Sequence, residues 1–250
     1  MATLFTLFRK ELRAFFLHPF GWVVLAFVAT MQGLSMSTAM KQLEDKALTE
    51  DLVSIVFHSP SFWFYFLFIF PLITMRLFAE EERSGTLETL LTAPVRTWQV
   101  VLSKYLAALA FFVVLWIPAF LHFQIFSALT DIPPPFTKGS LMGGFLIVLL
   151  MGVFYTAVGT LASSLTSSQI GAGFITLGLL VIHFFLGYVT IIWGDSMRSS
   201  DVFHYISCQE HLRYFTKGLI DTRPIIYNLS MGVILLIFTH HVVDFRRWKR

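Results

Sequence analysis

The side chains that attract attention first lie in one short charged segment between two apolar runs. Glu80, Glu81 and Glu82 follow one another, and after Arg83 comes Ser84-Gly85-Thr86. In a chain that is otherwise apolar, a charged segment with its own breaking and capping residues has to lie in water. Such a segment is suited to binding, because a protein outside the membrane can contact it.

Motifs for catalysis are absent from the sequence. It contains no His-Glu-x-x-His, Gly-x-Ser-x-Gly or Cys-x-x-Cys pattern, and no glycine is followed by lysine. A phosphate-binding Gly-Lys-Ser/Thr loop therefore cannot exist in this chain, and any ATP hydrolysis has to come from another subunit. We assign no catalytic residue and expect the chain to bind no cofactor and not to be an enzyme.

Two histidines, His122 and His183, fall within apolar runs. An ionisable group at membrane depth is by default a candidate functional site. The alternative, which we favour, is a neutral imidazole hydrogen-bonded to a neighbouring helix. Cys208, Glu210 and His211 stand close together further along the chain. Three possible ligands without a fourth do not make a zinc motif, so we predict no metal site.

The composition identifies the class of protein. Hydrophobic residues make up 56% of the chain and charged residues 13%, which excludes a soluble domain with a wetted surface. We predict an all-α polytopic membrane protein with six transmembrane helices, each near the 20 apolar residues that cross a bilayer. The runs are Phe20–Met40, Pro60–Phe78, Tyr105–Leu129, Gly139–Leu161, Ile170–Trp193 and Ile225–Val243. They contain no Asp or Glu, which disfavours proton-driven transport.

The distribution of basic residues predicts the orientation. Six spans place both termini on one side, and 11 of the 18 Lys and Arg residues fall on that side. The positive-inside bias then makes both termini cytoplasmic. Residues 79–97 become a cytoplasmic loop, and residues 195–223 become a segment at the outer face.

The whole chain, residues 1–250, is interpreted as a single membrane domain. Within residues 1–19, apolar side chains repeat at helical spacing with Arg9, Lys10 and Arg13 between them, which predicts an amphipathic helix in the inner interface. A signal peptide and a frayed basic tail are the alternatives. The His18-Pro19 pair ends this helix before the first span.

The charged loop itself is predicted to contain a helix, a break and a second short helix. Residues 78–83 continue the second span, Ser84-Gly85 interrupts it, and Thr86 can cap a helix that presents leucines on one side until Pro94 ends it. The alternative is a solvated turn between two spans. A solvated turn would need neither a helix cap nor an apolar face, so the presence of both favours a segment that docks on a partner.

These residues carry a family resemblance. The run of Phe78, Glu81, Gly85, Thr86, Glu88, Leu91, Pro94 and Lys104 resembles the signature of the type-2, exporter-class permeases of ATP-binding-cassette transporters. The sequence Met-Arg-Leu-Phe-Ala-Glu-Glu, followed by Ser-Gly-Thr, is similar to that of the gliding-motility-type and nitrous-oxide-maturation-type branch. The closing residues 218–227 and the basic tail 246–249 resemble the same branch, so the resemblance covers nearly the whole chain.

The resemblance implies a permease subunit in the bacterial cytoplasmic (inner) membrane. It implies that a separate cytoplasmic ATPase, which binds ATP and Mg²⁺, grips the loop as a coupling helix. The coupling residues carried over by position are Glu80, Glu81, Gly85, Thr86, Glu88 and Pro94. The expected partners are this ATPase, a second permease (identical or a sister), membrane lipids and an extracytoplasmic protein, with no nucleic acid.

Two other functions stay open. The chain can be a membrane anchor that transmits force to an extracytoplasmic partner and passes no substrate, driven by the same ATPase. It can also be an intramembrane enzyme built around His122 or His183, although no carboxylate accompanies either histidine in the spans.

Overall fold

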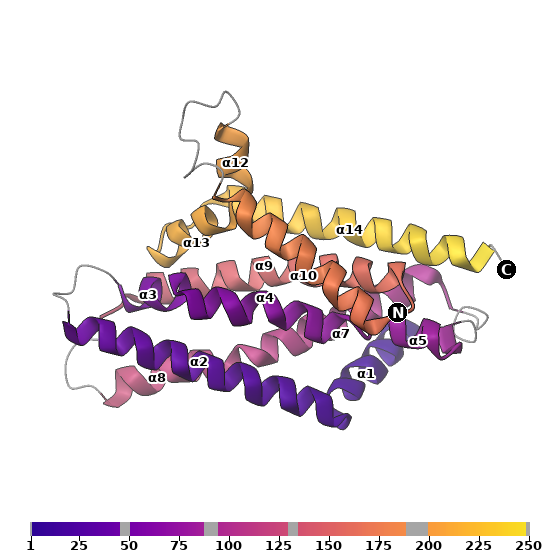
Figure 1. Cartoon of the computed structure of the whole chain (residues 1–250), viewed down its shortest axis with the longest axis horizontal. Coiled ribbons are helices and arrows are strands. Elements are labelled where there is room, and N and C mark those ends of the chain that lie inside the picture. The colour runs from indigo at the N-terminus through magenta and orange to yellow at the C-terminus, as the bar shows by residue number, and fades with distance from the viewer. Residues whose placement is uncertain (1, 46–50, 88–94, 130–134, 189–199, 249–250) are drawn as a thin grey trace.

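The structure, a computed structural model, describes residues 2–45, 51–87, 95–129, 135–188 and 200–248. Every regular element within these ranges is a helix (Figure 1). The helices are α1 (Ala2–Leu17), α2 (Pro19–Asp45), α3 (Leu52–His58), α4 (Pro60–Thr74), α5 (Ala79–Arg83), α7 (Thr97–Leu115), α8 (Ile117–Leu129), α9 (Lys138–Leu165), α10 (Gln169–Leu186), α12 (Ser200–Ile206), α13 (Cys208–Thr216) and α14 (Thr222–Trp248).

Six helical segments in the described residues are long and apolar enough to span a membrane, which confirms the predicted fold class. The third span differs in its start: it begins at Thr97 rather than at the predicted Tyr105. Lys104 interrupts the apolar run in the sequence, but this side chain is buried within the protein and the helix continues through it. Hydropathy alone therefore placed the boundary too late.

The spans that contain α4 and α9 form the centre of the bundle. In each, 72% of the most apolar stretch is buried, against 17% in α10 and 22% in α14. Glycine allows the close approach at this centre, because a Cβ atom at Gly159 of α9 would overlap the side chain of Thr74 in α4. Aromatic rings fill the remaining space, with Phe70 of α4 5.1 Å from Phe112 of α7 and 5.2 Å from Tyr155 of α9 between ring centroids.

The third span is broken between α7 and α8. Pro118 cannot donate a backbone hydrogen bond, and the helix ends at Leu115 and restarts at Ile117. The side-chain amide of Gln32 in α2 donates to the carbonyl oxygen of Leu115 at 3.0 Å. A neighbouring helix thus satisfies a backbone group at the break, as a bilayer interior requires.

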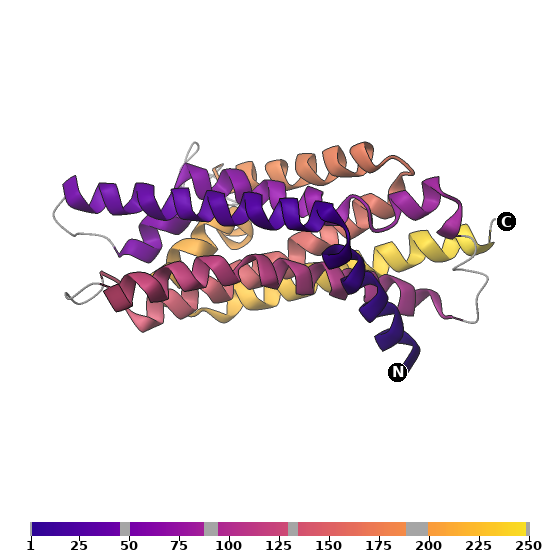
Figure 2. The same ribbon diagram turned by 90° about the horizontal axis from the view of Figure 1, so that it is seen from below.

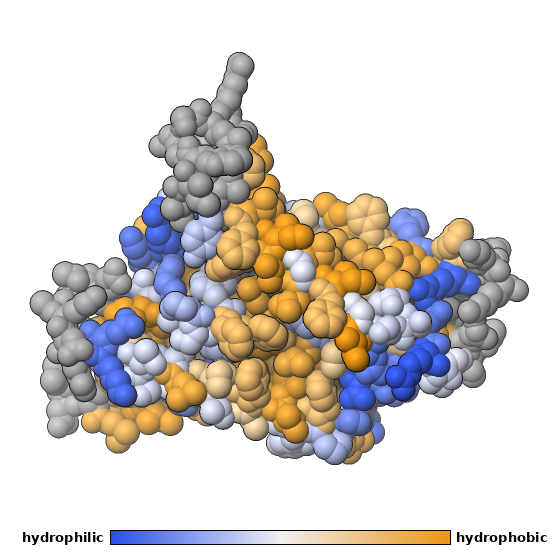
Figure 3. Space-filling model, in the orientation of Figure 1, coloured by the Kyte–Doolittle hydropathy of each residue, from blue (hydrophilic) through white to orange (hydrophobic). Residues whose placement is uncertain are grey.

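The bundle has two distinct ends. Both chain termini and α5 lie toward one end, where α1 leaves the bundle at a steep angle, and α3 lies at the other (Figures 1 and 2). Helix α12 projects away from the bundle axis (Figure 1). The surface view shows an apolar band between hydrophilic ends (Figure 3). The end with α1 and α5 carries four of the predicted coupling residues, Glu80, Glu81, Gly85 and Thr86.

Candidate functional site

The segment that follows α4 is fixed to the central helix α9. The Ser163 hydroxyl of α9 accepts hydrogen bonds from the backbone N–H groups of Phe78 (3.0 Å) and Ala79 (3.2 Å). The same hydroxyl donates to the carbonyl oxygen of Met75 at 3.2 Å. Because Ser163 is fully buried, these bonds hold the start of α5 in one place against the core.

Lys104 is the centre of a buried ion cluster at this end. Its side chain is 2% exposed, and its Nζ lies 2.8 Å from Glu81 Oε1 of α5 and 3.2 Å from Glu11 Oε2 of α1. One cation thus joins α1, α5 and α7. A buried charge needs such partners, and removing one of them typically costs about 3–5 kcal/mol.

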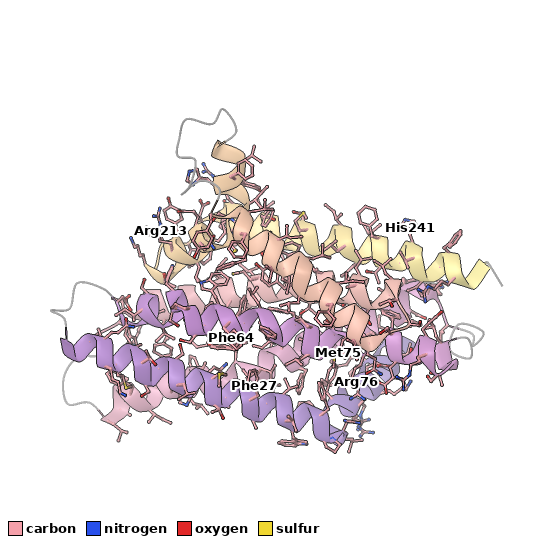
Figure 4. The ribbon with its side chains drawn as sticks, in the orientation of Figure 1. Phe27, Phe64, Met75, Arg76, Arg213 and His241 are labelled. Atoms are coloured by element: carbon pink, nitrogen blue, oxygen red, sulfur yellow. The ribbon has the colours of Figure 1, made fainter. Side chains whose placement is uncertain are left out.

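The other two carboxylates of α5 have partners of their own. Glu80 Oε2 lies 3.0 Å from Nε of Arg76, which stands just after α4 (Figure 4). Glu82 Oε2 lies 2.8 Å from Arg246 Nη1 near the end of α14. The three consecutive carboxylates therefore point to three different parts of the protein, and α5 cannot move without disturbing α1, α7 and α14.

Gly85 ends α5 with a left-handed backbone. Its φ is +71°, and no atom lies within 4 Å of where a Cβ would stand, so only the backbone conformation favours glycine there. The Thr86 hydroxyl lies 2.9 Å from Ser84 Oγ, and Leu87 is buried against a small apolar cluster that includes Val243 of α14. Glu88 and Pro94, the other two predicted coupling residues, lie outside the described residues.

His183 is held between two tyrosines. Its Nδ1 lies 2.9 Å from the Tyr155 hydroxyl of α9, and its Nε2 lies 3.1 Å from the Tyr227 hydroxyl of α14. Both ring nitrogens are thereby used in joining α9, α10 and α14. The imidazole thus bridges two tyrosine hydroxyls, and neither ring nitrogen is left to act on a substrate.

His122 lies elsewhere, on α8, and lines a small cavity with Gln32 and Trp116. Within the described residues its buried Nδ1 has no hydrogen-bond partner. The structure does not bring His122 and His183 together into one site, because His122 faces α2 across Gly33 whereas His183 faces α9 and α14.

The segment predicted to lie at the outer face, residues 195–223, offers no metal cluster in the part that the structure describes. Cys208 is fully buried, and burial raises the pKa of its thiol to about 12. Glu210 pairs with Arg213 at 2.8 Å, and His211 Nε2 lies 2.9 Å from the carbonyl oxygen of Tyr205. Burial lowers the pKa of His211 to about 4, so this imidazole is neutral near pH 7.

Comparison with known families decides the identity. The sequence profile of the ABC-2 family transporter proteins matches residues 3–243. The chain belongs to the ABC-2 family. No curated protein matches it. This ABC-2 chain is thus a membrane-spanning permease subunit of an ABC transporter, and its family is the membrane component and not the ATPase.

Sequence reasoning did not find the contacts that fix the predicted coupling segment of this ABC-2 permease. Lys104 was named only for the family resemblance and was left outside the predicted third span, whereas the structure buries it inside α7. Glu11 and Ser163 were not connected with this segment. One signal was present: Glu11 is the only acidic residue before Glu44, and it stands on a helix that is otherwise basic and apolar. A lone carboxylate of this kind indicates a cationic partner.

Proposed function

We propose that this ABC-2 permease is the membrane half of an ATP-driven exporter and that residues 79–97 dock on a separate ATPase. The observation that carries the proposal is the set of ties at α5. Glu81 is ion-paired to Lys104 of α7, Glu82 to Arg246 of α14, and the backbone before α5 is bonded to Ser163 of α9. A force applied to this segment therefore reaches three membrane spans directly.

The energy for the movement comes from the partner. ATP and Mg²⁺ bind to the ATPase, whose closed and open arrangements have different affinities for nucleotide, and this difference biases the two states of the permease. Two permeases, identical or paired with a sister chain, face each other above two ATPases. The coupling residues of this segment are Glu80, Glu81, Gly85, Thr86, Glu88 and Pro94.

We place the chain in the bacterial cytoplasmic membrane with both termini in the cytoplasm. The basic residues support this orientation, because 11 of 18 Lys and Arg residues fall on the side of the termini. Residues 195–223 then face outward, where they can contact an extracytoplasmic partner. The sequence around Arg76 and Gly85 favours membership of the gliding-motility-type and nitrous-oxide-maturation-type branch.

Gly85 provides the test. A valine there forces a β-branched residue into the left-handed region, which costs about 1–3 kcal/mol or redirects the chain that follows. Because no atom lies near the Cβ position, the bundle itself has no clash to relieve. We expect Gly85→Val to abolish permease-stimulated ATP hydrolysis in the reconstituted complex while the chain still folds.

Gly178→Val is the matched control. Gly178 also has no atom within 4 Å of its Cβ position, but it lies inside α10, far along the chain from the coupling segment. This variant should keep normal ATPase stimulation. If Gly85→Val stimulates the copurified ATPase as well as the unmodified chain does, residues 79–97 are not the coupling segment.

One observation favours the second function, a membrane anchor that transmits force without passing a substrate. Helix α12 projects from the bundle (Figure 1) and exposes Val202 and Tyr205, which are 56% and 42% accessible. Apolar side chains in this position suit contact with an extracytoplasmic protein. Removing residues 200–206 should leave ATPase stimulation intact in either case, but it should abolish cellular activity only if α12 is the effector surface.

A further inference from the structure

A cavity of about 310 Å³ opens at the end of the bundle where α1 and α5 lie. It is enclosed by α1, the start of α2, the end of α4, α5 and one residue of α7. Arg76, which lines it, is seen near α1 and α5 in Figure 4. The volume is at the lower end of the range for small-molecule sites, which is about 300–1,000 Å³.

The lining is amphipathic. Its apolar part comes from the start of the first span, from the second half of the second span and from α1. These residues are Phe20, Gly21, Leu72, Ile73, Leu77, Ala14 and Phe15. Its charged part contains the carboxylates of Glu11, Glu80 and Glu81 and the cations of Lys10, Arg76 and Lys104. Fixed charges of opposite sign are equal in number, so the cavity does not favour a net anion or a net cation.

Two groups in the lining have hydrogen-bonding capacity that no described residue uses. Among the described residues, Oε2 of Glu81 is buried and has no hydrogen-bond partner, so it can accept a bond from a donor in the cavity. His18 Nδ1 accepts the backbone N–H of Phe20 at 3.1 Å, which places the ring proton of the neutral imidazole on Nε2. The cavity thus presents an unused carboxylate oxygen together with an N–H donor and the guanidinium of Arg76.

We propose that this cavity binds the headgroup of an amine-bearing zwitterionic phospholipid, phosphatidylethanolamine. The primary ammonium donates to Glu81, and the phosphate accepts from Arg76 and His18. The acyl chains continue along Phe20, at the start of the first membrane span, and along Leu72, near the end of α4 in the second span.

The chemistry of the lining selects this headgroup over other phospholipids. Phosphatidylcholine carries the same charges, but its quaternary nitrogen has no N–H group to donate to Glu81. Phosphatidylglycerol brings a net negative charge to a lining whose fixed charges balance. Binding does not depend on the proposed coupling function. If that function holds as well, the lipid stabilises α1 against the coupling segment.

Native mass spectrometry of the purified full-length chain tests the proposal. The chain is offered phosphatidylethanolamine, phosphatidylcholine and phosphatidylglycerol with identical acyl chains at equal concentrations. We expect at least about tenfold greater retention of phosphatidylethanolamine than of phosphatidylcholine, which corresponds to the loss of one charge-assisted hydrogen bond. This comparison needs no substitution and no ATPase.

Two matched variants test whether the lipid binds in this cavity. Arg76→Gln should lose the phosphatidylethanolamine adduct, whereas Arg9→Gln should keep it, because Arg9 is exposed on α1 and does not line the cavity. Equal retention of the two zwitterionic lipids, a preference for phosphatidylglycerol, or the absence of any adduct would overturn the proposal. So would equal loss of the adduct in both variants.

Discussion

Replacing Lys104 with methionine is the most informative single perturbation of the site. The substitution keeps an unbranched side chain of similar length but removes the cation between Glu11 and Glu81. Both carboxylates are mostly buried, with side chains 13% and 18% exposed, so neither regains full hydration. We expect a loss of about 3 kcal/mol in the free energy of unfolding, at the low end for a broken buried pair because of this partial exposure.

The expected loss corresponds to a measurable shift in thermal unfolding. For a chain of this size, each kcal/mol moves the midpoint by about 2–4 °C, so Lys104→Met should unfold about 6–12 °C below the unmodified chain. Tryptophan fluorescence of the purified chain in detergent reports the transition. Lys41→Met is the control, because Lys41 is exposed near the end of α2, and it should shift the midpoint by no more than about 2 °C.

A rescue experiment separates the ion cluster from simple packing. Adding Glu11→Gln and Glu81→Gln to Lys104→Met removes the uncompensated charges, so the triple variant should be more stable than Lys104→Met alone. The reasoning is refuted if Lys104→Met unfolds within 2 °C of the unmodified chain, or if the two glutamine substitutions only add further loss.

Three further predictions concern packing and titration. Gly159→Ala should lower the free energy of unfolding by about 1–3 kcal/mol, and with it the unfolding midpoint, because the new Cβ overlaps Thr74. Gly178→Ala is the control and should not lower the midpoint, because the space around Gly178 is open. Equal midpoints for the two variants would contradict the packing described here. Because burial raises the pKa of Cys208 to about 12, the folded chain should not react with a maleimide at pH 8. The chain should react once it is unfolded in detergent. Rapid labelling of the folded chain would be inconsistent with the structure. Burial lowers the pKa of His211 from 6.5 to about 4, so the unfolded chain binds this proton more tightly than the folded chain does. The free energy of unfolding should therefore fall as the pH drops from 6.5 toward 4. His211→Gln should make this pH dependence shallower, and an unchanged dependence would count against a neutral buried imidazole.

The sequence was sufficient for the parts of this fold that depend on local properties. Long apolar runs predicted six spans because crossing a bilayer requires length and apolarity, and both are visible in one stretch of sequence. Gly85 was predicted to interrupt a helix, and it has the left-handed backbone that glycine adopts without strain.

The partners of the charged residues could not be predicted in the same way. Glu11 and Glu81 both pair with Lys104, and Glu82 pairs with Arg246, across long stretches of chain. These pairs depend on how each helix is rotated and where it meets its neighbours, which hydropathy does not specify. For the same reason, Lys104 was left outside the predicted third span although it is enclosed by protein.

The central claim is that the segment beginning at α5 touches an ATPase, and cross-linking tests it most directly. With Cys208 replaced by serine, a single cysteine in place of the exposed Thr86 is joined by a short bifunctional reagent to whatever protein copurifies from the membrane. The account predicts one cross-linked product that contains a nucleotide-hydrolysing subunit, and no such product when the cysteine replaces Lys41 at the other end of the bundle. Cross-links from Lys41 but not from Thr86, or labelling of the Thr86 cysteine from outside intact cells, would contradict it.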